Sequence, residues 1–97
     1  MDETLELAIE SPEGIIDCML EPQLNDTELF YNVTILYPNI VDGFSKSEVY
    51  CYNMRRESKM GDYYFDEGEV SIHPKIKKLE TQISKAIVSE QMTNIRH

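Results

Sequence analysis

The sequence predicts an α+β domain in which an antiparallel β-sheet of four to six strands is followed by one C-terminal α-helix packed on one face. Two observations predict this fold: apolar side chains recur at every second position in most of the N-terminal part, and at helical spacing after Pro74. Strands followed by a helix are typical of a two-layer α+β domain, here with a meander-like sheet. The chain of 97 residues is the size of one domain, so we expect a single domain over 1–97.

The first two strands are expected to form a hairpin. Residues 4–10 alternate between apolar and mostly acidic side chains, which is the pattern of a strand with one buried face. A turn with proline and glycine follows at 11–14, and the alternation resumes over 15–21. The outward face of this hairpin is expected to carry four acidic side chains together: Glu6, Glu10, Asp17 and Glu21.

Further strands are predicted from their composition. Residues 28–37 are the strongest candidate, because aromatic and β-branched side chains dominate this segment. A loop is expected before it, over 21–26, and another after it, over 38–47, where a proline ends the alternation. Residues 48–56 alternate again, and a short strand is expected at 63–65 after a charged hairpin tip. The segment that follows, with Val70 and Ile72, either continues the sheet or leads into the helix.

One helix is predicted from Pro74 onward, since proline fits the first position of a helix. A single apolar stripe runs along it, formed by Ile76, Leu79, Ile83, Ala86 and Ile87. The stripe fails after Val88, so residues 89–97 are expected to fray.

The start of this helix contains an electrostatic conflict. Lys75, Lys77 and Lys78 lie in the first turns, where the helix dipole favours acidic side chains. Nearby acidic groups are expected to compensate, either those of the N-terminal hairpin or those of the preceding turn, Asp66, Glu67 and Glu69. The alternative is that an anion or an acidic partner binds at this end.

The charges are divided unevenly along the chain. Residues 1–45 contain ten acidic side chains and no basic one, or −10, and the rest contains nine bases and eight acids, or +1, which together give the net charge of −9. Such an asymmetry bears on electrostatic fields and partners, not on a reaction. The acidic hairpin face is therefore interpreted either as a solvated surface or as a docking face for a basic partner.

The sequence contains no catalytic or metal-binding motif. His73 directly precedes the predicted helix, where a capping residue would lie, and His97 is the last residue. Cys18 and Cys51 are interpreted as two reduced thiols that pack as small apolar side chains, with a disulfide between neighbouring strands as the alternative. We therefore expect no catalytic residue, no metal and no cofactor.

Basic residues gather at one predicted hairpin tip, where Arg55, Arg56 and Lys59 are flanked by tyrosines that could stack on bases. The net charge of −9 opposes nucleic-acid binding, because affinity for phosphates depends on a basic surface. Direct binding of nucleic acid is therefore not expected. The same three residues, with Lys75 and Lys78, are possible secondary contacts for a protein partner.

No apolar stretch approaches the roughly 20 residues that span a bilayer, and no signal peptide is visible, so we expect a cytoplasmic protein without membrane contact. The sequence favours a small acidic protein, not an enzyme, that regulates or inhibits another macromolecule by docking a basic protein surface through its N-terminal hairpin.

Two other functions stay open. The first is a structural homo-oligomer, a homodimer included, because one helix cannot cover a wide sheet and because Ile40, Val41 and Phe44 lie in a predicted loop. The second is a small-ligand binder or enzyme with a tyrosine-lined pocket near His73.

Overall fold

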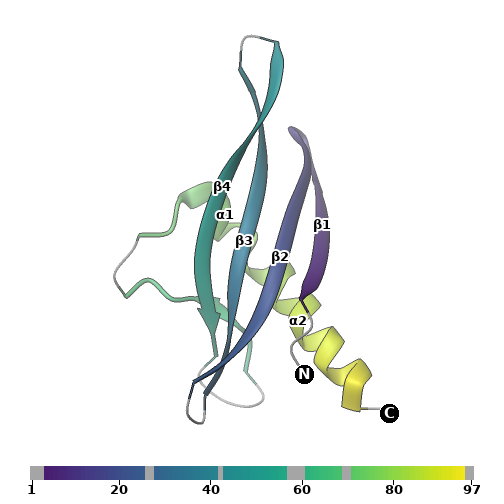
Figure 1. Cartoon of the computed structure of the whole chain (residues 1–97), viewed down its shortest axis with the longest axis vertical. Coiled ribbons are helices and arrows are strands. Elements are labelled where there is room, and N and C mark those ends of the chain that lie inside the picture. Colours follow the sequence, from purple (N-terminus) through teal and green to yellow (C-terminus); the bar gives the residue numbers. More distant parts are fainter. Residues whose placement is uncertain (1–3, 26–27, 42, 57–60, 69–70, 96–97) are drawn as a thin grey trace.

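The computed structural model describes residues 4–25, 28–41, 43–56, 61–68 and 71–95. Within these ranges, five strands form one antiparallel sheet whose spatial order follows the chain, and two helical segments come after it (Figure 1). The elements are β1 (Leu5–Ser11), β2 (Gly14–Asn25), β3 (Glu28–Val41), β4 (Phe44–Arg55), β5 (Tyr64–Phe65), α1 (Pro74–Lys77) and α2 (Glu80–Ile95). The predicted α+β fold with an antiparallel meander and a C-terminal helix is confirmed.

The first hairpin closes with a two-residue turn, because Ser11 pairs with Gly14. Gly14 has a φ angle of +133°, which side chains rarely adopt, and its carbonyl accepts a hydrogen bond of 2.7 Å from Ser11 Oγ. A Cβ on Gly14 would meet the ring of Pro38 at 3.5 Å. That distance is an ordinary van der Waals contact, so the positive φ angle of the turn, and not the neighbouring strand, favours glycine here.

Two predicted loops are strand instead, because proline does not end either strand. Residues 21–25 extend β2 through Pro22, and residues 38–41 extend β3 through Pro38. Pro22 lies beyond Leu20, where the pairing with β1 stops, and Pro38 lies beyond Leu36, where the pairing with β2 stops. Among the described residues, each proline thus lies where its strand has a neighbour on one side only, a place where a missing N–H is tolerated.

The second half of the predicted loop over 38–47 belongs to a long β3–β4 hairpin. Val41 pairs with Phe44, and Gly43 has a φ angle of +81°. The Asp-Gly dipeptide at 42–43 is a strong hairpin signal that the interpretation as a loop overlooked. Phe44 is exposed, whereas the side chains of Ile40 and Val41, which were expected to be exposed, lie outside the described residues.

The core lies between one face of the sheet and the helices, which Figure 1 shows behind the strands. Alternate residues of the strands fill it, and Val33, Ile35 and Met54 are fully buried. The helical side contributes the predicted stripe, with Ile76, Leu79, Ile83 and Ile87 all buried. Burial of this one sheet face against the stripe gives the two-layer arrangement.

The predicted single helix is divided into α1 and α2. Leu79 N–H donates to the carbonyl of Ile76, three residues back, at 2.9 Å, which tightens the turn between the two segments. The apolar stripe nevertheless continues across this break. The backbone of α2 is helical to Ile95, and the expected fraying over 89–97 stays a prediction.

Candidate functional site

One face of the sheet has no helix packed against it in the part of the chain that the structure describes. It is the face turned toward the viewer in Figure 1, and we call it the open face. The strand register defines its members as Glu6, Ala8, Glu10, Ile15, Asp17, Met19, Glu21, Asn32, Thr34, Leu36, Val49, Cys51 and Asn53.

The four predicted acidic side chains all lie exposed on this face: Glu6, Glu10, Asp17 and Glu21. They do not form a continuous acidic row. The register places Glu6 opposite Met19, Glu10 opposite Ile15, and Asp17 between Ala8 and Leu36. The open face is therefore a mixture in which carboxylates alternate with aliphatic side chains.

The apolar members of the open face are the part that the sequence interpretation missed. Ile15 is 50% exposed, Met19 41% and Val49 64%. A shallow depression of about 520 Å³ lies between β1 and β2, bordered by Glu6, Met19 and Leu36 among others. The sequence does contain a feature from which these exposed apolar residues could have been predicted: in residues 15–21, apolar residues occur on both faces of the predicted strand.

The lysines at the start of the helix are compensated, but mostly by partners that were not predicted. Lys75 Nζ pairs with Glu48 on β4, and this hydrogen bond raises the pKa of Lys75 and lowers the pKa of Glu48. Lys77 Nζ lies 3.3 Å from Glu67 and 3.0 Å from Glu80, and the hydrogen bond to Glu80 is the main cause that raises its pKa. Lys78 is exposed at the end of α1.

Of the expected compensating acids, only Glu67 is confirmed. Asp66 pairs with Arg55 instead, and Glu69 lies outside the described residues. Glu6, Glu10, Asp17 and Glu21 point to the open face while the helices pack on the other one, so these four do not compensate the lysines. Glu13 at the hairpin turn does lie near the helix start, because it accepts a hydrogen bond of 3.5 Å from Tyr37, whose ring centre lies 4.6 Å from Lys75 Nζ. The four carboxylates on the open face therefore form no ion pair with the lysines at the helix start.

The surroundings of His73 form a cap and a cation–π cluster. His73 Nδ1 accepts a hydrogen bond of 3.3 Å from Lys75 N–H, which makes it the N-cap of α1 as the sequence suggested. Lys75 Nζ lies 4.6 Å from the ring centre of Tyr37 and 5.4 Å from that of Tyr50. The tyrosines near His73 thus surround the lysine of the same chain.

The basic hairpin tip does not form an exposed stacking platform among the described residues. Arg55 Nε lies 2.8 Å from Asp66 Oδ2, and its guanidinium lies 4.5 Å from the ring centre of Phe30. The guanidinium of Arg56 lies 5.0 Å from the centre of the Tyr63 ring, which is buried. Both arginines are engaged within the domain, and Lys59 lies outside the described residues.

The two cysteines are free thiols on opposite faces of the sheet, so the alternative of a disulfide is wrong. Cys18 is buried in the core, and this burial, with the charge of Asp17, raises its pKa to about 11. Cys51 is exposed on the open face, with Sγ 3.4 Å from Thr34 Oγ1. The interpretation as a small core side chain therefore holds for Cys18 alone.

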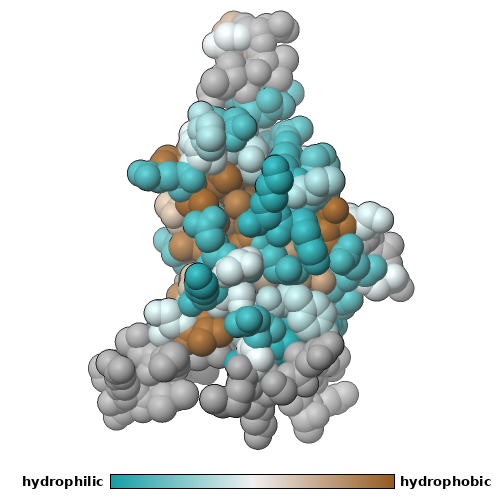
Figure 2. Space-filling view, turned by 180° about the vertical axis from the view of Figure 1, so that it is seen from behind, coloured by the Kyte–Doolittle hydropathy of each residue, from teal (hydrophilic) through white to brown (hydrophobic). Residues whose placement is uncertain are grey.

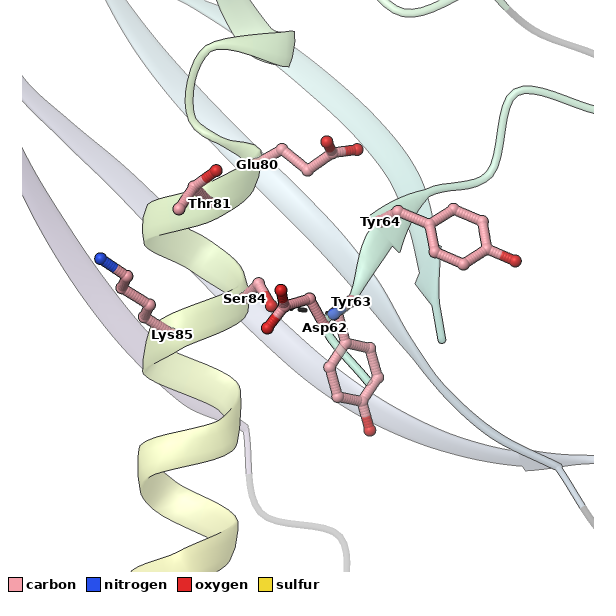
Figure 3. A pocket seen from close by; sticks show the side chains of 7 residues that line it. All are labelled: Asp62, Tyr63, Tyr64, Glu80, Thr81, Ser84 and Lys85. Atoms are coloured by element: carbon pink, nitrogen blue, oxygen red, sulfur yellow. Dashed lines mark hydrogen bonds between the residues drawn. The ribbon is translucent and has the colours of Figure 1, made fainter. Parts of the chain in front are cut away.

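A hollow of about 320 Å³ lies where α2 meets β5 (Figure 3). Ser84 Oγ accepts a hydrogen bond of 2.8 Å from Tyr63 N–H, and Glu80 Oε2 accepts one of 2.8 Å from Phe65 N–H. Figure 3 shows Glu80 and Ser84 extending from α2 toward Tyr63 and Tyr64, and Thr81 and Lys85 extending from α2 away from these tyrosines. The central polar groups of this hollow thus attach the helix to the edge strand, and His73 is not part of it.

No group of three or more histidine, cysteine, aspartate or glutamate side chains is placed to hold a metal ion within the described ranges. No helix in the same ranges is long and apolar enough to cross a membrane. Comparison with protein-family models, with curated proteins and with solved structures gave no match. The candidate site therefore rests on the geometry of the open face alone.

Proposed function

We propose that this chain is a protein-binding module whose open face docks a partner with an apolar surface surrounded by basic side chains. The observation that carries this proposal is the alternation of carboxylates with exposed aliphatic side chains on the open face, as in the pairs Glu6–Met19 and Glu10–Ile15. Binding there would regulate or inhibit the partner by covering its basic surface, with no chemical step.

The two kinds of side chain have separate roles in this proposal. Exposed aliphatic groups such as Ile15 and Val49 would supply the apolar contact that forms the centre of protein interfaces. The carboxylates around them would select a basic partner and speed its approach. The charge of −10 over residues 1–45 would extend this attraction beyond the contact surface.

A basic partner fits the open face better than a second copy of the same chain does. Two open faces in contact would bring the carboxylates of both copies together, and juxtaposed like charges oppose association. The homo-oligomer stays a testable alternative: we expect light scattering to report a monomer at low salt, and a dimer there would favour it.

The test is affinity capture from the native host at low and high salt with a matched pair of variants. Glu6→Gln with Asp17→Asn neutralises two carboxylates of the open face. Thr81→Lys with Gln82→Lys changes the net charge by the same amount on the exposed side of α2. We expect the first variant to lose a partner that the second retains, and high salt to weaken the capture.

The outcomes separate docking from a general charge effect. Equal losses in both variants would show that only net charge matters. Retention of the partner by the open-face variant, also when Ile15→Asn is added, would contradict docking at this face.

A further inference from the structure

The two edge strands of the sheet, β5 and β1, differ in what covers their outer backbone groups. At one edge, the short strand β5 pairs within the described residues with Met54 and Arg55 of β4 alone. The N–H groups of Tyr63 and Phe65 donate to Ser84 and Glu80 of α2, so the helix covers β5 itself; Figure 3 shows the bond between Tyr63 and Ser84. At the opposite edge, β1 pairs with β2 alone within the described ranges. Figure 1 shows β1 at the rim of the sheet.

The β1 edge has the regularity that a further strand requires. Its pairing with β2 is continuous from Leu5 to Ser11, without a bulge, and its seven residues include neither proline nor glycine. In an antiparallel ladder, every second residue of an edge strand directs its N–H and C=O away from the neighbouring strand. An edge of this kind can take up an extended segment from another protein.

The side chains of β1 restrict which segment fits. Glu6 and Glu10 lie on the open face, and an antiparallel pair of two copies centred on Ala8 would place Glu6 of one copy opposite Glu10 of the other. Like charges directly opposite each other destabilise a strand pair, whereas opposite charges stabilise it. The acids thus oppose self-pairing in this register and favour a basic strand.

The other side of β1 is apolar. Leu5 and Leu7 are only partly buried and, with Val88 of α2, pack at the margin of the core. Figure 2 shows apolar atoms at the surface of the helix side, on the side of the molecule where β1 lies. A segment added there would therefore meet apolar groups on one face and carboxylates on the other.

We propose that β1 takes up an extended segment of the partner as a sixth strand, with lysine or arginine opposite Glu6 and Glu10 and apolar residues beside Leu5 and Leu7. This inference rests on the proposed function and specifies the partner as a protein with an extended segment in which basic and apolar residues alternate. Backbone hydrogen bonds would supply affinity, and the alternate side chains would supply specificity.

The test uses a blocked nine-residue peptide that alternates lysine and valine, added to the full chain and followed by amide NMR spectra and hydrogen exchange. We expect shifts and slower exchange at alternate residues of β1. Two further peptides carry N-methyl groups on alternate amides, in the two possible phases, and we expect one phase to abolish binding and the other to retain it.

Matched variants locate the contact. Neutralising Glu6 and Glu10 to glutamine should weaken binding of the peptide by about 2- to 30-fold, from two cross-strand ion pairs. Neutralising Asp17 and Glu21 on the neighbouring strand should weaken it less. Equal effects of the two pairs would place the peptide on the open face and overturn the edge proposal.

Other outcomes also overturn it. These are binding of both N-methylated peptides as tightly as the parent peptide, absence of any shift at millimolar peptide, or tighter binding of a peptide with the sequence of β1 itself, which would assign the edge to a second copy. The capture experiment decides the proposed function separately, because loss of a partner through the open-face variant does not require strand addition.

Discussion

The two faces of the sheet are made by the same strands, yet they differ in what holds them. On the covered face, Val33 and Ile35 are fully buried in the core that the sheet shares with the helices, and every buried side-chain polar atom of the described residues has a hydrogen-bond partner. On the open face, Ile15 and Val49 are exposed among carboxylates. The burial of apolar side chains that stabilises the domain is therefore concentrated on one face of the sheet.

The two thiols should show the largest contrast between the faces. A thiol reagent should label Cys51 at once, whereas Cys18 should react at least about three orders of magnitude more slowly, because its exposure requires an opening that costs on the order of 5 kcal/mol. Mass spectrometry after timed labelling measures both rates. In denaturant the two rates should converge. Similar rates in the native protein would contradict the distinction between the faces.

Truncation of one isoleucine on each face should show the next largest difference. Ile35→Ala removes a fully buried side chain and should lower the free energy of unfolding by about 2–5 kcal/mol. Ile15→Ala, the matched control at a half-exposed position, should change it by no more than about 0.5 kcal/mol. Urea unfolding measures both values. Equal losses would show that the open face is covered in solution.

The attachment of α2 to β5 should have a smaller effect. Ser84→Ala removes the acceptor of the Tyr63 N–H at a site where Ser84 is 3% exposed, so it should cost about 1–3 kcal/mol. Thr81→Ala, on the exposed side of α2, is the control and should be near neutral. Hydrogen exchange at Tyr63 should increase in the first variant alone. Unchanged exchange there would mean that the helix does not protect this edge.

The smallest effect is expected from the Arg55–Asp66 pair, whose side chains are partly exposed to solvent. Hydrogen bonds from Arg55 and from Gly68 N–H lower the pKa of Asp66 below its ordinary value of 3.8. The unfolded state therefore binds more protons in acid, so this stabilisation is present above the unfolded pKa and is lost as pH falls through the folded pKa. The difference in melting temperature between the wild type and Asp66→Asn should therefore become smaller as the pH is lowered from about 6 to about 2.5.

Arg55→Gln is the control for this pH dependence, since it removes the largest cause of the shift. In that background, Asp66→Asn should change the melting temperature by a smaller and less pH-dependent amount. A carboxyl pKa of Asp66 at or above 3.8 in an NMR titration of the wild type would refute the assignment.

Much of the fold could be predicted from local periodicity. The alternation in 28–37 predicts one face made of Leu29, Tyr31, Val33, Ile35 and Tyr37. Leu29 is exposed and Tyr37 is half-buried, whereas the middle three are buried. The spacing of Ile76, Ile83 and Ile87 predicted the helical stripe that covers them. A period of two or of 3.6 residues fixes which side chains share a face, whatever the rest of the chain does.

The candidate site could be predicted in part. The parity of Glu6 and Asp17 placed them together on the outward face, where the structure has them. The aliphatic side chains between them were not recognised. Residues 15–21 carry apolar side chains on both faces of the strand, but local periodicity does not show which of the two faces stays uncovered. Pro22 and Pro38 misled the prediction of loops, since a proline is compatible with a strand wherever the neighbouring strand has ended.

Local sequence patterns are enough to predict the succession of strands and helix along the chain, the sides on which acidic and apolar residues lie, and the unequal division of charge. Three features depend on the folded arrangement: Lys75 pairs with Glu48, α2 covers β5, and β1 lies at the rim of the sheet. The reason is physical: periodicity is a property of neighbouring residues, whereas an ion pair or a covered edge depends on where distant segments come to lie.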